Sequence, residues 1–186
     1  MIMQELVQIR PEMETALQEL PILQYAVLPV SEVTFEQRIR YVCEHECPQY
    51  NTSWSCPPAV GTVEECRERC SAYTNCFLFS TISEVRDITD MEETLGTRME
   101  HEEITREVVK LFQAFYGEVI ALSTESCAVC SKCTWPDAPC RNPDRMFPCV
   151  ESYGIVVSEL AEKAGMDFMN GQNIVTWFSV IFFDRK

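Results

Sequence analysis

The chain has 186 residues, of which 46% are hydrophobic, and its 29 acidic and 15 basic residues give a formal net charge of −14. This length is enough for one domain with a substantial hydrophobic core. The acidity argues against a nucleic-acid-binding protein, because neutralising phosphates requires a basic face. No apolar run approaches the roughly 20 residues that a membrane-spanning helix needs, so we also expect no association with a membrane.

Hydrophobic periodicity and capping signals predict alternating helices and strands in the first half of the chain. In the segment T-V-E-E, Glu65 follows Thr62 by three residues, which is a capping-box pattern that predicts the start of a helix. Pro21 is expected to end an earlier helix. The elements expected here are a helix at 11–20, a strand at 22–30, a helix from Thr62 to about residue 73, and a strand at 75–82.

A second capping-box pattern, from Thr89 to Glu92, predicts the start of the longest helix. We expect this helix to end near Tyr116, because Gly117 is a typical stop residue. Most of its charged residues, together with His101, are expected to face solvent. Its buried stripe is expected to comprise Met91, Leu95, Ile104, Val108, Leu111, Phe112 and Phe115.

The remaining elements complete an α/β pattern. They are a strand at 118–123, two short helices at 146–153 and 156–164, and a strongly apolar strand at 176–183. Four strands interleaved with helices predict a small mixed β-sheet flanked by helices. We therefore expect a single α/β metal-binding domain over residues 1–186, with cysteine-rich metal-binding loops at one end, at about 43–58 and 127–149.

Eleven cysteines are the most informative feature of the sequence. Eight of them fall in two groups, Cys43, Cys47 and Cys56 in the first and Cys127, Cys130, Cys133, Cys140 and Cys149 in the second. The total is odd, and no apolar signal segment is visible in the first twenty residues. Both observations favour a reducing compartment, so we expect a cytoplasmic protein that uses these thiols to bind metal.

The spacing of the cysteines favours iron over zinc. The run C-x2-C-x2-C from Cys127 matches the opening of the ferredoxin-type run C-x2-C-x2-C-x3-C-P, although six residues separate Cys133 from Cys140. Structural zinc usually takes cysteines in pairs, whereas these come in threes. We therefore expect one or two [4Fe–4S] clusters, with zinc as the alternative. Each triplet then needs one distant ligand, and Cys140 and Cys149 are available.

Three functions stay open at this point. The first is electron transfer between one or two clusters and a redox partner protein. The second is a structural zinc protein whose surface mediates interactions. The third is an iron–sulfur enzyme: if Cys149 is not a ligand, one iron is open to water, substrate or another side chain, with His45 and Asp144 nearest in sequence.

Other residues near the cysteines have two possible roles. Trp54 and Trp135 either shield a cluster from water or simply pack. Lys132 and Arg141 either donate hydrogen bonds to cluster sulfurs or are ordinary surface residues. Three further cysteines on a predicted helix and strand are expected to be small buried residues, namely Cys66, Cys70 and Cys76.

Two motifs carry a resemblance to a known family. They are C-x3-C-P-x-Y…S-C-P-P in the first half and C-x2-C-x2-C…P-C-R-N-P…P-x-x-E-x-Y-G in the second. The chain from Arg40 onward resembles an uncharacterised group of cysteine-rich prokaryotic proteins described as predicted metal-binding proteins. At Cys149 that family tends to have a small polar residue, and the resemblance implies no substrate or reaction. It implies ligands at Cys43, Cys47, Cys56, Cys127, Cys130, Cys133 and Cys140.

Overall fold

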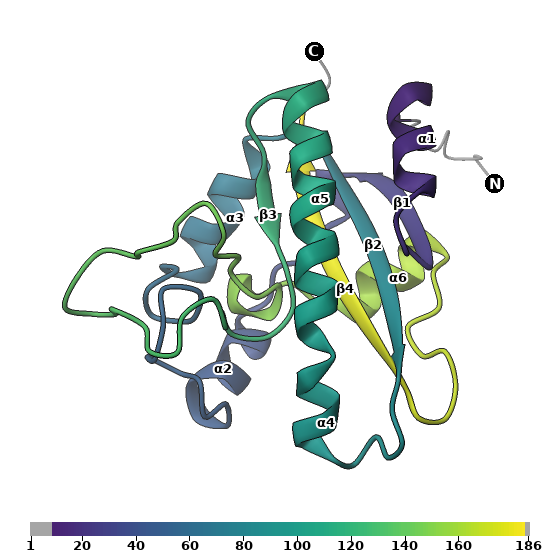
Figure 1. Ribbon diagram of the computed structural model, residues 1–186. Coiled ribbons are helices and arrows are strands. Elements are labelled where there is room, and N and C mark those ends of the chain that lie inside the picture. The colour runs from purple at the N-terminus through teal and green to yellow at the C-terminus, as the bar shows by residue number, and fades with distance from the viewer. Residues whose placement is uncertain (1–8, 185–186) are drawn as a thin grey trace.

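A four-stranded β-sheet forms the centre of the protein. The structure is a computed structural model that describes residues 9–184. The strands lie side by side in the order β1-β2-β4-β3 (Figure 1). Their bounds are β1 Gln24–Pro29, β2 Asn75–Glu84, β3 Ile120–Leu122 and β4 Ile174–Phe183.

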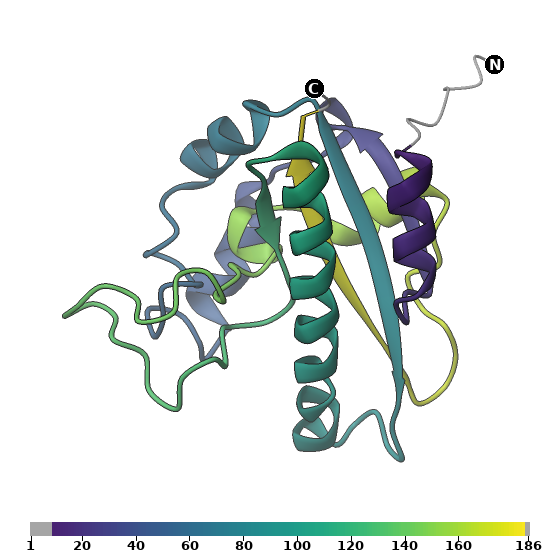
Figure 2. The same cartoon turned by 45° about the horizontal axis from the view of Figure 1, so that its top comes forward.

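Helices cover both faces of this sheet. Within residues 9–184 they are α1 Pro11–Gln18, α2 Gln37–His45, α3 Val63–Ser71, α4 Met91–Gly96, α5 Arg98–Tyr116 and α6 Val157–Ala164, with short 3-10 helices η1 Val30–Glu32 and η2 Glu151–Tyr153. α1 and α5 lie on one face, and α3 and α6 lie on the other (Figures 1 and 2). None of the helices in this part of the chain has the length and apolar character that crossing a membrane requires.

The alternation of side chains along β2 divides the core between the two faces. Phe77 and Phe79 pack with α1 and α5, whereas Cys76 and Leu78 pack with α3 and α6, because successive strand residues point to opposite faces. Cys66 and Cys70, on α3, belong to the same core cluster as Cys76 and Leu78. The prediction that Cys66, Cys70 and Cys76 are buried is confirmed.

The α/β class is confirmed, but the sheet is not mixed. Each pair of neighbouring strands is antiparallel. β2 and β3, which are joined through α4 and α5, do run in the same direction. β4 lies between them and pairs with both in the opposite direction, which a pattern of alternating helices and strands does not reveal.

The prediction of the longest helix is correct at its C-terminal end and wrong at its N-terminal end. It ends at Tyr116, followed by Gly117 with a φ of 88°, as predicted. At the other end the cap is Asp90, whose carboxylate accepts hydrogen bonds from the amides of Glu92 and Glu93. A break after α4 separates it from α5, and Met91 is 62% exposed where the sequence predicts burial.

Two predictions beside the cysteines are also wrong. The sequence predicts a loop at Cys43, but this residue lies in the last turn of α2. Among the residues of α2 only Arg40 is buried, so the helix lacks the apolar stripe by which helices are predicted. The helix predicted at 146–153 is reduced to η2, because Pro148 disfavours helical backbone in the residue before it.

His101 lies in the core and not on the solvent face of α5. Its side chain is 1% exposed. Its Nδ1 is 2.8 Å from Oγ1 of Thr81, and its Nε2 is 2.8 Å from Oγ of Ser179. Burial lowers the pKa of His101 to about 3, so the imidazole is neutral at physiological pH. A helical charge pattern does not distinguish this histidine from an exposed one.

Candidate metal centre

Two segments that carry the cysteines lie together beyond the β3 edge of the sheet (Figures 1 and 2). The first comprises the end of α2 and the loop that leads to α3. The second is the long loop between β3 and η2. A hydrogen bond of 2.8 Å from the amide of Cys127 to Oγ of Ser55 joins the two segments directly, so cysteines far apart in sequence share one region.

The first group forms an electrostatically coupled set. Burial raises the pKa of the Cys43 thiol to about 11, and the charges of Cys47, Glu151 and Cys56 contribute to that rise. Cys47 and Cys56 are therefore close enough to Cys43 to oppose its ionisation. A bound metal centre supplies the positive charge that allows such thiols to be thiolates.

Cys149 lies beside this first group. Burial raises the pKa of its thiol well above the ordinary value, and the charge of Cys43 contributes. The backbone holds Cys149 in place, because it forms an isolated bridge with Ser123 at the end of β3. Its Sγ also accepts a hydrogen bond of 3.3 Å from the amide of Ser152 and lies 3.2 Å from a carboxylate oxygen of Glu151.

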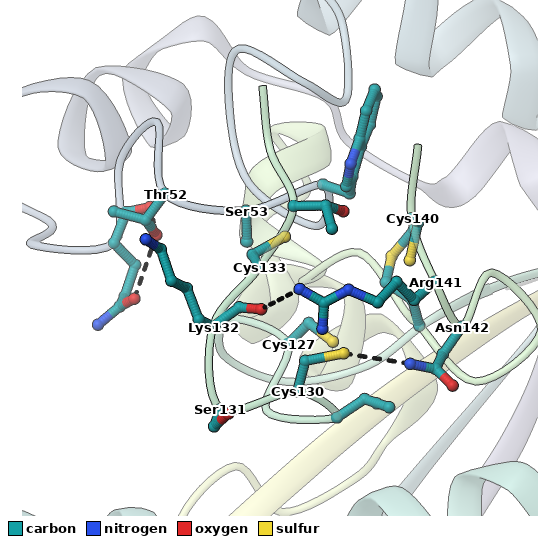
Figure 3. Close-up of a pocket in the computed structure, with 15 residues that line it drawn as sticks. Thr52, Ser53, Cys127, Cys130, Ser131, Lys132, Cys133, Cys140, Arg141 and Asn142 are labelled. Carbon is teal, nitrogen blue, oxygen red and sulfur yellow. Dashed lines mark hydrogen bonds between the residues drawn. The ribbon is translucent and has the colours of Figure 1, made fainter. Parts of the chain in front are cut away.

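The other four cysteines line one cavity of about 290 Å³, shown in Figure 3. They are Cys127, Cys130, Cys133 and Cys140. Burial raises the pKa of the Cys127 thiol, and the charges of Cys140 and Cys130 add to the effect. The charge of Cys140 therefore acts on the first cysteine of the C-x2-C-x2-C triplet, in the same way as the charge of Cys43 acts on Cys149.

Polar side chains accompany these four thiols in the cavity. Nδ2 of Asn142 donates a hydrogen bond of 3.1 Å to Sγ of Cys130. Arg141 extends across the cavity in Figure 3 and donates to the backbone oxygen of Lys132 at 3.1 Å. Hydrogen bonds to sulfur and nearby cations stabilise thiolate-bound metal. Asn142 is a donor of this kind that spacing of cysteines does not identify.

Two tryptophans fasten the cysteine segments to each other. Nε1 of Trp54 donates to the backbone oxygen of Ala138 at 3.1 Å, and Nε1 of Trp135 donates to Oδ1 of Asn51 at 2.8 Å. Their rings meet edge to face, with centroids 4.7 Å apart. Each segment thus donates one indole N–H to the other, which supports the packing role for both residues.

Replacing Trp54 with phenylalanine is expected to destabilise the protein by about 1 kcal/mol, because one hydrogen bond between the segments is lost. Hydrogen exchange is expected to accelerate in the loop around Ala138. The matched control is W177F, which removes the hydrogen bond of 2.9 Å that Nε1 of Trp177 donates to Oγ1 of Thr97. Both variants should lose comparable stability by urea denaturation, but only W54F should increase exchange in the cysteine loops. Equal exchange in the two would contradict the fastening role.

The two non-cysteine ligand candidates, His45 and Asp144, contact residues other than the cysteines. The imidazole of His45 stacks on Tyr41 with ring centroids 3.8 Å apart, and its Nδ1 is 2.9 Å from the backbone oxygen of Tyr41. Asp144 lines a separate pocket with Arg145 and Phe147. Across residues 9–184, no three His, Cys, Asp or Glu side chains are arranged to hold a single metal ion.

An α/β fold whose free thiols gather in two loop segments is typical of a cysteine-rich metal-binding protein. The family model DUF2284, described as a predicted metal-binding protein, matches residues 26–183. The chain belongs to this family, which confirms the resemblance seen in the cysteine motifs. Comparison with curated proteins and with solved structures gives no match.

Proposed function

We propose that the protein is an iron–sulfur electron-transfer protein with two [4Fe–4S] clusters. One cluster is bound by Cys43, Cys47, Cys56 and Cys149, and the other by Cys127, Cys130, Cys133 and Cys140. The observation that carries this proposal is the division of eight thiols into two groups: four line one cavity, and among the other four the charges of three affect Cys43 or are affected by it. Each set combines three cysteines from one segment with a fourth from farther along the chain.

The chemistry of the ligands supports iron–sulfur clusters. Thiolates are soft ligands, and four of them complete the coordination of a [4Fe–4S] cluster. All eleven cysteines are free thiols, and a reducing compartment such as the cytoplasm keeps them available. Four thiolates per set also satisfy structural zinc, so metal analysis decides between these two functions.

Complete ligation supports electron transfer over catalysis. With four cysteines in each set, no iron is left open for a substrate. The two sets lie in segments joined by the Ser55–Cys127 hydrogen bond and by the tryptophan pair. The exposed side chains of Tyr41 and Val42 on α2 offer an apolar surface beside Cys43. For an acidic chain, a redox partner with a basic docking face is expected.

EPR spectroscopy of the reduced protein tests this function. Dithionite reduction of anaerobically purified protein is expected to give the signals of two reduced clusters that interact magnetically, because the two sets lie in adjoining segments. A protein that contains its full iron but shows no paramagnetic signal at any applied potential would not be an electron carrier.

A further inference from the structure

Arg40 is a buried cation without a carboxylate partner. It lies on α2 and is 3% exposed. Its two Nη atoms donate to the backbone oxygens of Gly61, at 2.7 Å, and of Ser152. Nη2 also lies 3.8 Å from Sγ of Cys66, and Nε has no hydrogen-bond partner. No carboxylate among residues 9–184 forms an ion pair with it.

Burial of a lone guanidinium is costly, because the charge loses its hydration and gains only neutral acceptors. Arg38, an exposed arginine on the same helix, does have anionic partners, since it pairs with Glu36 and Glu159. The charge of Arg40 therefore calls for an anion that the amino-acid side chains of the fold do not supply.

The contacts of Arg40 lead to the segments that carry the first cysteine set. Cys43 follows it by three residues, about one turn along α2. Gly61 ends the loop that contains Cys56. Ser152 accepts from Arg40 through its carbonyl and donates through its amide to Sγ of Cys149. Arg40 thus binds the backbone of the loop that carries Cys56 and of the turn that follows Cys149, and it lies on the same helix as Cys43.

We propose that Arg40 is the buried countercharge of the first metal centre, and that it stabilises the negative charge of a thiolate-ligated cluster at Cys43, Cys47, Cys56 and Cys149. This inference rests on the proposed function. A cluster becomes more negative on reduction, so a nearby fixed cation raises its reduction potential.

The test compares R40M, which removes the charge but keeps a long side chain, with R40K, which keeps the charge. The matched control is R38M, which removes an exposed arginine from the same helix. Iron content and the reduction potential of each cluster are measured on all three and on the wild type. We expect R40M either to lose one of the two clusters or to shift the potential of one cluster to a more negative value, and R40K and R38M to stay close to the wild type.

Two results would overturn this proposal. One is an R40M protein with both clusters and unchanged potentials. The other is an equal loss in R40M and R40K, which would mean that the shape of arginine matters and its charge does not. Iron-free wild-type protein is a different result, because it contradicts the proposed function before Arg40 is tested. Circular dichroism of each variant identifies any that does not fold, and R40K then tests the charge alone.

Discussion

Replacement of Cys149 with serine is expected to lower the iron and sulfide content of anaerobically purified protein from about eight of each to about four per chain. Cys149 is the fourth ligand that we assign to the first set, on the basis of its coupling to Cys43. The bridge to Ser123 and the hydrogen bond from the Ser152 amide fix its position. No other cysteine in that region is free to replace it, because Cys140 is coupled to the second set.

Matched variants separate ligand loss from general damage. C76S changes a buried thiol in β2 that is part of the core, and it should keep the full iron content. C140S should lose the other cluster, and the double variant C140S/C149S should retain almost no iron. Unchanged iron content and an unchanged EPR spectrum in C149S would remove Cys149 from the ligands. The first set would then have three cysteines and one open iron, as expected for an enzyme.

Acidification is expected to destabilise the protein strongly through His101. The folded protein holds this imidazole neutral, with a pKa of about 3, whereas the unfolded chain protonates it near pH 6.5. Because the unfolded state then binds more protons, stability falls as the pH falls below 6.5, and the loss continues down to about pH 3. Between these two pKa values, His101 lowers the free energy of unfolding by about 1.4 kcal/mol for each pH unit of acidification.

The variant H101Q isolates this contribution, because glutamine does not titrate. At pH 7.5 the wild type should be the more stable protein, since its imidazole bonds to Thr81 and Ser179. Between pH 7.5 and pH 5.0 its advantage over H101Q should shrink by about 2 kcal/mol. Urea denaturation of both proteins across this range measures the difference. A constant difference would mean that His101 titrates equally in the folded and unfolded states.

Local signals in the sequence predict several elements correctly. The capping box at Thr62 is present, with the Glu65 amide donating to Oγ1 of Thr62 and the Thr62 amide donating to the Glu65 carboxylate. Gly117 ends α5, and the grouping of cysteines identifies the two segments that gather beyond β3. These features depend on residues within a few positions of one another, which is why sequence patterns predict them.

Features that depend on distant contacts are not predictable in this way. Which single cysteine joins which triplet depends on the contact of Cys149 with the end of β3. Sequence patterns do not predict α2, because its only buried residue is Arg40. The backbone oxygens that accept hydrogen bonds from Arg40 belong to Gly61 and Ser152, 21 and 112 residues away in sequence. The burial of His101 is not predictable for the same reason, since its partners Thr81 and Ser179 lie on β2 and β4.

The central claim is that two sets of four thiolates bind two [4Fe–4S] clusters, and metal analysis of a single protein sample tests it most directly. Anaerobically purified protein is analysed for iron, sulfide and zinc, and its visible spectrum is recorded. We predict a brown protein with about eight irons and eight sulfides per chain. A colourless protein with stoichiometric zinc, and with no iron uptake on reconstitution, would contradict the claim and indicate two structural metal sites.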